Sequence, residues 1–178
     1  MNVGTLSRTQ SPAWAWILAG GLAAGTLDAA FATGFWALAA GLPWTRVFQS
    51  VAAGLLGREA SFAGGAATAW LGLGLHYVIA TLFVVAYALV AIRFRGLVRK
   101  PLGNGLAYGL LLYVVMNFVV IPLSAIGQLP KFDNTAWVAA SIAVHAAVGV
   151  LCARFARRAL RTRQVSPGGL SARRRPVP

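Results

Sequence analysis

The sequence predicts an all-α membrane protein with four transmembrane helices and an extracytoplasmic, interfacial amphipathic helix between the first and the second. Of the 178 residues, 58% are hydrophobic and 11% are charged, and the mean hydropathy is +0.71. Four apolar runs are long enough to cross a bilayer, which needs about 20 residues per helix. A water-soluble domain does not carry this much apolar sequence.

The first transmembrane helix is predicted at residues 13–40, after a short cytoplasmic tail at residues 1–12. It contains one carboxylate, Asp28, which would cost about 2.5 kcal/mol or more if it faced hydrocarbon. Gly21 and Gly25 share a helical stripe with Asp28, and small residues let membrane helices approach closely. We therefore expect Asp28 to point into the bundle, either as a packing anchor or as a proton or ligand group.

The segment at residues 43–56 is predicted to be an amphipathic helix that lies in the membrane interface. Pro43 suits the first turn of a helix. One face is apolar and carries Trp44, Val47, Phe48, Val51 and Leu55. The opposite face is polar and carries Thr45, Arg46, Gln49 and Ser50. A re-entrant segment that caps the bundle is the alternative.

The second transmembrane helix is predicted at residues 66–92. It contains His76 one turn after Gly72, a residue at which we expect close helix packing. A basic cluster followed by Pro101 ends this helix. The cluster consists of Arg93, Arg95, Arg99 and Lys100.

The third and fourth transmembrane helices are predicted at residues 102–126 and 135–153. The third carries Asn117, and Pro122 near its far end is expected to kink it or end its regular part. The fourth carries His145 on a stripe of small and polar residues. The transmembrane domain as a whole is thus placed at residues 13–156, and a basic, largely disordered tail at residues 157–178.

The distribution of basic residues predicts the orientation. Of the 16 basic residues, thirteen lie near the two termini or between the second and third helices, and the other side has Arg46, Arg58 and Lys131. Loops rich in arginine and lysine stay in the cytoplasm. Both termini are therefore expected to be cytoplasmic. Because the basic residues sit at the ends of apolar runs, we expect them to contact lipid headgroups and not nucleic acid.

Each predicted transmembrane helix carries one strongly polar side chain within its apolar run: Asp28, His76, Asn117 and His145. Each of them lies about ten residues, or roughly 15 Å, from the outer end of its helix. We therefore expect the four side chains to share one level near the middle of the bilayer, and to be neighbours.

Three interpretations of this polar level are open. The side chains could bond to one another and only fix helix packing, at about 0.6 kcal/mol per bond. Asp28 and a histidine could pass a proton or hold a substrate. His76 and His145 could ligate a metal or haem from opposite helices, although the two histidines alone are a weak signal. We predict no resident cofactor and no metal site, with haem kept as the less favoured alternative.

No catalytic motif is present: the sequence has no phosphate-binding loop, no nucleophile elbow and no zinc-protease motif. The single cysteine, Cys152, excludes an internal disulfide and a cysteine-based metal cluster. We therefore expect a protein that is not an enzyme.

Several motifs resemble a family of small bacterial four-helix inner-membrane proteins of uncharacterised function. They are Gly-Thr-Leu-Asp ending at Asp28, Phe-Gln-Ser-Val-Ala-Ala-Gly-Leu-Leu-Gly from Phe48, Gly-Gly-Ala-Ala-Thr-Ala from Gly64 with Leu75-His76, and Tyr-Val-Val-Met-Asn-Phe-Val-Val-Ile-Pro-Leu-Ser from Tyr113. The resemblance covers residues 15 to 150. It implies a multi-pass protein of the bacterial inner membrane and gives no activity.

The function expected from these features is to bind or move a small solute, proton or lipid through the polar level inside the bundle. Four helices enclose little volume, so we expect a homo-oligomer or a partner in a membrane complex, in addition to membrane lipids. The alternative is a non-catalytic accessory or scaffold subunit whose polar level only fixes packing.

Overall fold

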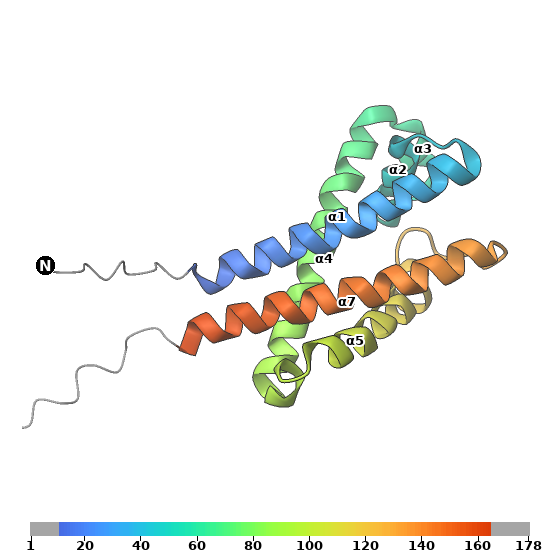
Figure 1. Ribbon diagram of the computed structural model, residues 1–178. Helices are drawn as coiled ribbons and strands as arrows, with labels where there is room; N and C mark the ends of the chain where they lie inside the picture. The colour runs from blue at the N-terminus through green and yellow to red at the C-terminus, as the bar shows by residue number, and fades with distance from the viewer. Residues whose placement is uncertain (1–10, 165–178) are drawn as a thin grey trace, which may run out of the picture.

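The computed structural model describes residues 11–164, and every regular element within them is a helix. Four helical stretches are long and apolar enough to cross a membrane. They are α1 (Ala13–Ala40), α4 (Gly65–Arg93), the stretch Pro101–Leu123 and α7 (Thr135–Gln164) (Figure 1). The all-α membrane fold with several spans is thereby confirmed.

Shorter elements connect the spans. An amphipathic helix, α2 (Trp44–Leu56), follows α1, and α3 (Arg58–Ala63) leads into α4. The 3-10 turn η1 (Arg95–Val98) links α4 to α5. The third span has three parts: α5 (Pro101–Val115), the π-helix η2 (Met116–Val120) and α6 (Ile121–Leu123).

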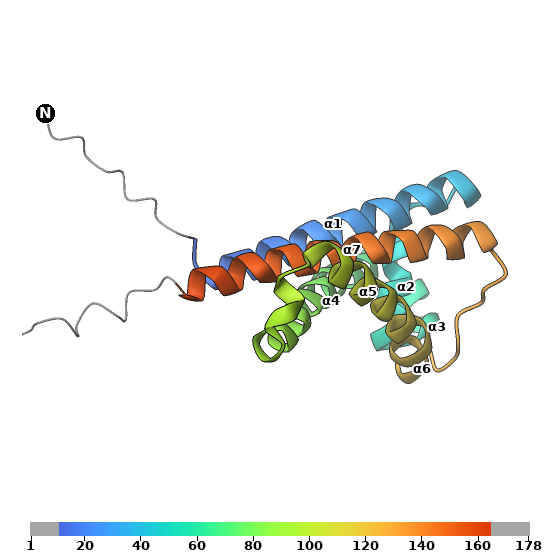
Figure 2. The same ribbon diagram turned by 60° about the horizontal axis from the view of Figure 1, so that its bottom comes forward.

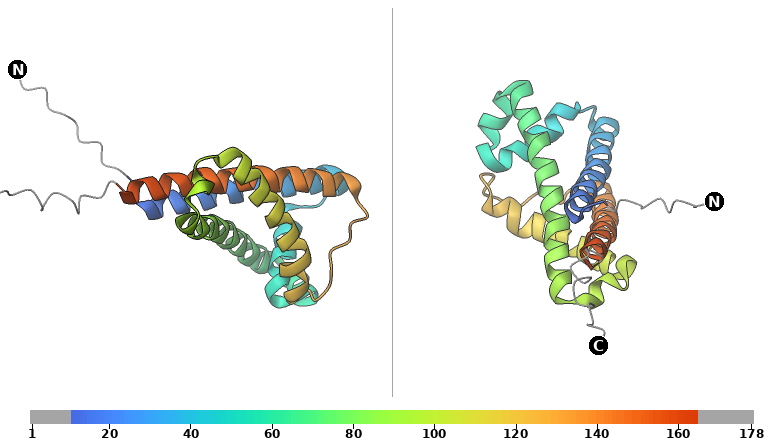
Figure 3. Two further views of the ribbon diagram at one scale, coloured as in Figure 1. Left: turned by 90° about the horizontal axis from the view of Figure 1, so that it is seen from below. Right: turned by 90° about the vertical axis from the view of Figure 1, so that its left-hand side faces the viewer.

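Helices α1 and α7 lie side by side, so that the start of α1 and the end of α7 share one end of the molecule, here named the terminal end (Figures 1 and 2). Helix α4 crosses this pair, and α5 packs along α7. Toward the opposite end, named the far end, α4 and the α5–α6 stretch diverge from the α1–α7 pair (Figure 3). Helices α2 and α3 lie at the far end (Figure 1).

The apolar core fills the terminal half of the bundle. It is built from small and medium-sized side chains of α1, α4, α5 and α7: Ala24, Val84, Tyr87, Ala88, Ala91, Leu112, Val148, Cys152, Ala153 and Ala156. Helix α4 reaches these residues in its second half, and α7 reaches them from Val148 onward. The four spans are in contact near the terminal end, whereas only α1 and α7 remain side by side toward the far end.

The glycines singled out in the sequence are points of close helix approach. A Cβ atom on Gly21, Gly25 or Gly72 would lie 2.7 Å from a heavy atom of a neighbouring segment. The atoms it would meet are Thr81 Cα, Tyr77 Cδ1 and the Phe48 carbonyl carbon, respectively. Only a residue without a side chain fits at this distance, so these glycines hold α1 and α2 against α4.

A second set of glycines joins α5 to α7. Gly105 and Gly109 face the backbone of α7 around Gly149, and a Cβ atom on Gly109 would lie 2.6 Å from Ala146 Cα. This contact was not among those predicted from the sequence. The four-residue spacing of Gly105 and Gly109 is the signal that could have found it.

Helix α2 differs from its prediction in one respect. Gln49, expected on the water-facing side, is 4% exposed, and its amide donates a hydrogen bond to the Gly65 carbonyl at 2.9 Å. The reason is that α2 packs against α4 and buries this side chain, together with Phe48, at the contact with Gly72.

The third span also differs from a simple helix. Pro122 has no N–H group, so the carbonyl four residues before it loses its α-helical partner. The π-helix η2 ends two residues before Pro122 and contains Phe118, the residue whose carbonyl loses its partner. The irregular hydrogen bonding of the span is thus confined to the turn that precedes the proline.

At the terminal end, α7 continues to Gln164, although the basic tail was predicted to begin at residue 157. The rest of the predicted tail and most of the predicted N-terminal tail lie outside the described residues.

Candidate functional site

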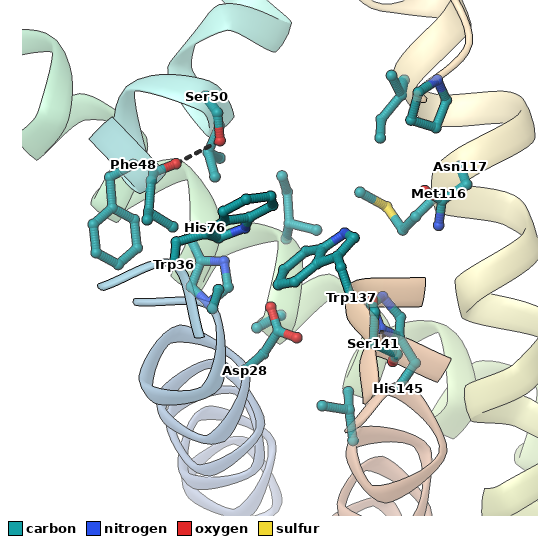
Figure 4. Close-up of a pocket in the computed structure, with 18 of the residues that line it drawn as sticks. Asp28, Trp36, Phe48, Ser50, His76, Met116, Asn117, Trp137, Ser141 and His145 are labelled. Carbon is teal, nitrogen blue, oxygen red and sulfur yellow. Dashed lines mark hydrogen bonds between the residues drawn. The ribbon is translucent and has the colours of Figure 1, made fainter. Parts of the chain in front are cut away.

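A pocket of about 780 Å³ lies in the far half of the bundle, and all four predicted polar residues line it. Each comes from a different segment: Asp28 from α1, His76 from α4, Asn117 from η2 and His145 from α7 (Figure 4). The structure thus brings together the residues that the sequence placed at one level.

The pocket is closed toward the terminal end. Ala24, Phe83 and Val148 line it and also belong to the apolar core or pack against it. The core therefore forms the floor of the pocket. On the other side, the lining residues Arg46, Ser50 and Arg58 are exposed, so the pocket opens toward the far end. The pocket is therefore closed at one end and open at the other.

Asp28 is half-buried, and its carboxylate is directed into the pocket, between the His76 imidazole and Trp137 (Figure 4). Within the described residues it forms no hydrogen bond and no ion pair. It is also the only acidic residue that lines the pocket. A carboxylate within an apolar span favours a position that faces other protein groups or a cavity, and Asp28 faces this pocket.

The two histidines are held by backbone carbonyls. His76 Nε2 lies 2.9 Å from the Gly25 carbonyl oxygen on α1, and His145 Nδ1 lies 2.9 Å from the Ser141 carbonyl oxygen on its own helix. A carbonyl oxygen only accepts, so both of these ring nitrogens carry hydrogen. In the neutral imidazoles the second nitrogen is then an acceptor: Nδ1 in His76 and Nε2 in His145.

Asn117 shows the same pattern. Its side-chain amide donates to the Tyr113 carbonyl at 2.8 Å, and its Oδ1 atom has no hydrogen-bond partner within residues 11–164. No hydrogen bond joins any two of Asp28, His76, Asn117 and His145 in this part of the chain. The four side chains therefore do not fix helix packing by bonding to one another.

Aromatic side chains form the wall between α1 and α7. The Trp137 ring stacks on Phe31, with centroids 5.3 Å apart and planes at 12°. It also contacts Phe35 and Trp36, each at 5.1 Å. Trp36 and Trp137 line the pocket, and so does Phe48 of α2, whose ring lies 5.8 Å from that of His76. Most of the pocket surface is apolar as a result.

Two arginines stand at the opening of the pocket. Arg46 of α2 and Arg58 of α3 lie over the ring of Phe62, at 5.3 and 6.0 Å from its centroid. From the sequence, Arg46 was expected on the polar face of the amphipathic helix, and Arg58 only as one of three basic residues on the outer side. Their meeting depends on the turn at Gly57, whose φ of 79° suits glycine, and no local sequence signal reveals it.

Comparison with protein-family models, curated proteins and solved structures gives no match. The resemblance to the bacterial inner-membrane family therefore stays a prediction. Within the described part of the chain, no three side chains of His, Cys, Asp or Glu lie close enough together to hold a metal ion. The side chains of the site supply acceptors inside, aromatic walls and cationic groups at the opening.

Proposed function

We propose that this membrane protein binds a small organic solute in the pocket of the far half, and that Asp28 receives a hydrogen-bond donor of that solute. The observation that carries the proposal is the convergence of Asp28, His76, Asn117 and His145, from four separate segments, on one pocket of about 780 Å³. Pockets that bind small molecules have this character: concave, mostly apolar, with a few convergent polar groups.

The unpaired carboxylate supports a binding role over a packing role. A polar group that only fixed helix pairing would bond to the opposite helix, as His76 does to Gly25. The Asp28 carboxylate is instead directed into the pocket (Figure 4). The volume of about 780 Å³ is within the range of small-molecule sites, which is about 300–1,000 Å³.

The position of the floor supports access from one side of the membrane. Because the count of basic residues favours cytoplasmic termini, the pocket opens to the outside in the proposed orientation, in a bacterial inner membrane. Transport across the membrane would require the core around Ala24 and Val148 to separate. The proposed activity is thus binding from the outer face, and a carrier function would add a second, inward-open state.

The test uses a cysteine in the pocket. Ala32 lines the pocket on α1, one turn beyond Asp28. In right-side-out vesicles, Ala32→Cys should react with a membrane-impermeant methanethiosulfonate reagent, and octylamine should slow this reaction in a saturable way. The native Cys152 is the internal control, because it is 0% exposed in the core and should stay unreactive.

Asp28→Asn in the Ala32→Cys background separates binding from membrane partitioning. It should leave the labelling rate without octylamine unchanged and remove most of the protection by octylamine. The proposal fails if the cysteine at position 32 does not react from the outside, or if octylamine protects the Asp28→Asn variant as well as it protects the protein that retains Asp28.

A further inference from the structure

The interior of the pocket offers acceptors to a ligand. The atoms without a partner among the described residues are the Asp28 carboxylate, His76 Nδ1, His145 Nε2 and Asn117 Oδ1, because the matching donors are used by backbone carbonyls. Such an arrangement favours a group that brings several donors and positive charge. A primary ammonium group, with three donors and no acceptor, has this chemistry.

The opening of the same pocket offers the opposite chemistry. Arg46 and Arg58 each present a guanidinium with five donors and no acceptor. They flank one phenylalanine ring, Phe62, which brings two cationic groups to one edge of the pocket. Guanidiniums at the edge of a pocket favour an anionic group such as a carboxylate or phosphate, which each of them can bind with charge-assisted hydrogen bonds.

Most of the remaining lining of the pocket is apolar. Trp36 and Trp137 close one side, and Phe48 and Met116 lie on others (Figure 4). A ligand that reaches from Asp28 to the arginines must therefore pass an uncharged stretch of the pocket. Polar groups in the middle of the ligand would lose their hydration there without gaining a partner.

We propose that the ligand of this pocket is a dipolar organic molecule, with an ammonium group at Asp28, an anionic group at Arg46 and Arg58, and an apolar segment between them. This inference rests on the proposed function, since it names the class of solute that the same pocket selects. The headgroup of phosphatidylethanolamine carries the same two charges, but only two carbons separate its ammonium group from the phosphate ester, which leaves no apolar segment. A soluble dipolar molecule is therefore the source that the pocket favours.

The test compares three probes of one chain length: 8-aminooctanoate, octylamine and octanoate. Each is titrated against the labelling of Ala32→Cys in nanodiscs of phosphatidylcholine and phosphatidylglycerol. We expect 8-aminooctanoate to protect at a concentration at least about tenfold below either singly charged probe, because each charged hydrogen-bonded end adds affinity. The 6-carbon and 12-carbon amino acids test other charge separations in the same assay.

Variants assign each end of the probe. Asp28→Asn should make 8-aminooctanoate no better than octanoate, and Arg46→Gln combined with Arg58→Gln should make it no better than octylamine. Arg95→Gln, an exposed arginine that does not line the pocket, and Glu59→Gln, next to Arg58, are the matched controls and should change neither comparison.

Three results would overturn the inference or its basis. If octylamine protects as well as every amino acid of the series, and the double arginine variant does not change this, the dipolar ligand is wrong while the binding pocket stands. If no probe protects the cysteine at position 32, the proposed function fails as well. If nanodiscs with phosphatidylethanolamine abolish protection by 8-aminooctanoate, the dipolar ligand is a lipid headgroup, and the soluble ligand is rejected.

Discussion

Gly109→Ala tests whether the contact between α5 and α7 holds the bundle and its pocket together. A Cβ atom at position 109 would lie 2.6 Å from Ala146 Cα and 2.7 Å from the His145 carbonyl carbon. Both are backbone atoms, which cannot turn away as a flexible side chain can. Helix α7 would therefore have to move away from α5 at His145 and Ala146. His145 lines the pocket, so this movement would change the pocket as well.

The magnitude follows from two opposing effects. Overpacking of this kind costs about 1–3 kcal/mol. Alanine is the better helix former and recovers about 0.5–1 kcal/mol. The net free energy of unfolding should fall by about 1 kcal/mol, and by at most about 2.5 kcal/mol, and 1 kcal/mol corresponds to roughly 2–4 °C in the melting temperature of a protein of this size.

Gly103→Ala is the matched control on the same helix. No neighbouring atom of residues 11–164 lies within 4 Å of a Cβ atom at this position, so the variant should be as stable as the natural protein or slightly more stable. The assay is the loss of helical circular dichroism on heating in a mild detergent, followed by octylamine protection of Ala32→Cys. Equal melting temperatures for the two alanine variants would refute the close contact. Unchanged octylamine protection in the Gly109→Ala variant would refute its link to the pocket.

Two further predictions concern the topology and the far end. With both termini in the cytoplasm, Lys131→Cys should react with an impermeant thiol reagent from the outside and Arg99→Cys only after permeabilisation, and the reverse pattern would invert the orientation. Gln49→Ala should lower the free energy of unfolding by about 1 kcal/mol, because it removes the hydrogen bond to the Gly65 carbonyl. Ser50 is exposed on the same helix, and Ser50→Ala should have little effect. Equal melting temperatures for these two variants would show that Gln49 does not hold α2 in place.

The positions of the spans and of the polar residues could be read from the sequence because both are local properties. The length of an apolar run decides whether a helix can cross the membrane, and α1 begins and ends where its run does, at Ala13 and Ala40. Counting residues from the helix ends placed Asp28 and His145 at one depth. Depth along a helix depends only on the rise per residue, so it needs no knowledge of the neighbours.

The tertiary structure decided which faces meet. The pattern of α2 is amphipathic, but only its crossing with α4 at Gly72 turned Gln49 inward. The one-sided shape of the pocket depends on the divergence of the spans toward the far end (Figure 3). The position of both Arg46 and Arg58 near the Phe62 ring depends on the turn at Gly57. Crossing angles and turns arise from contacts between segments far apart in the chain, whereas hydropathy and helical period are properties of one segment at a time.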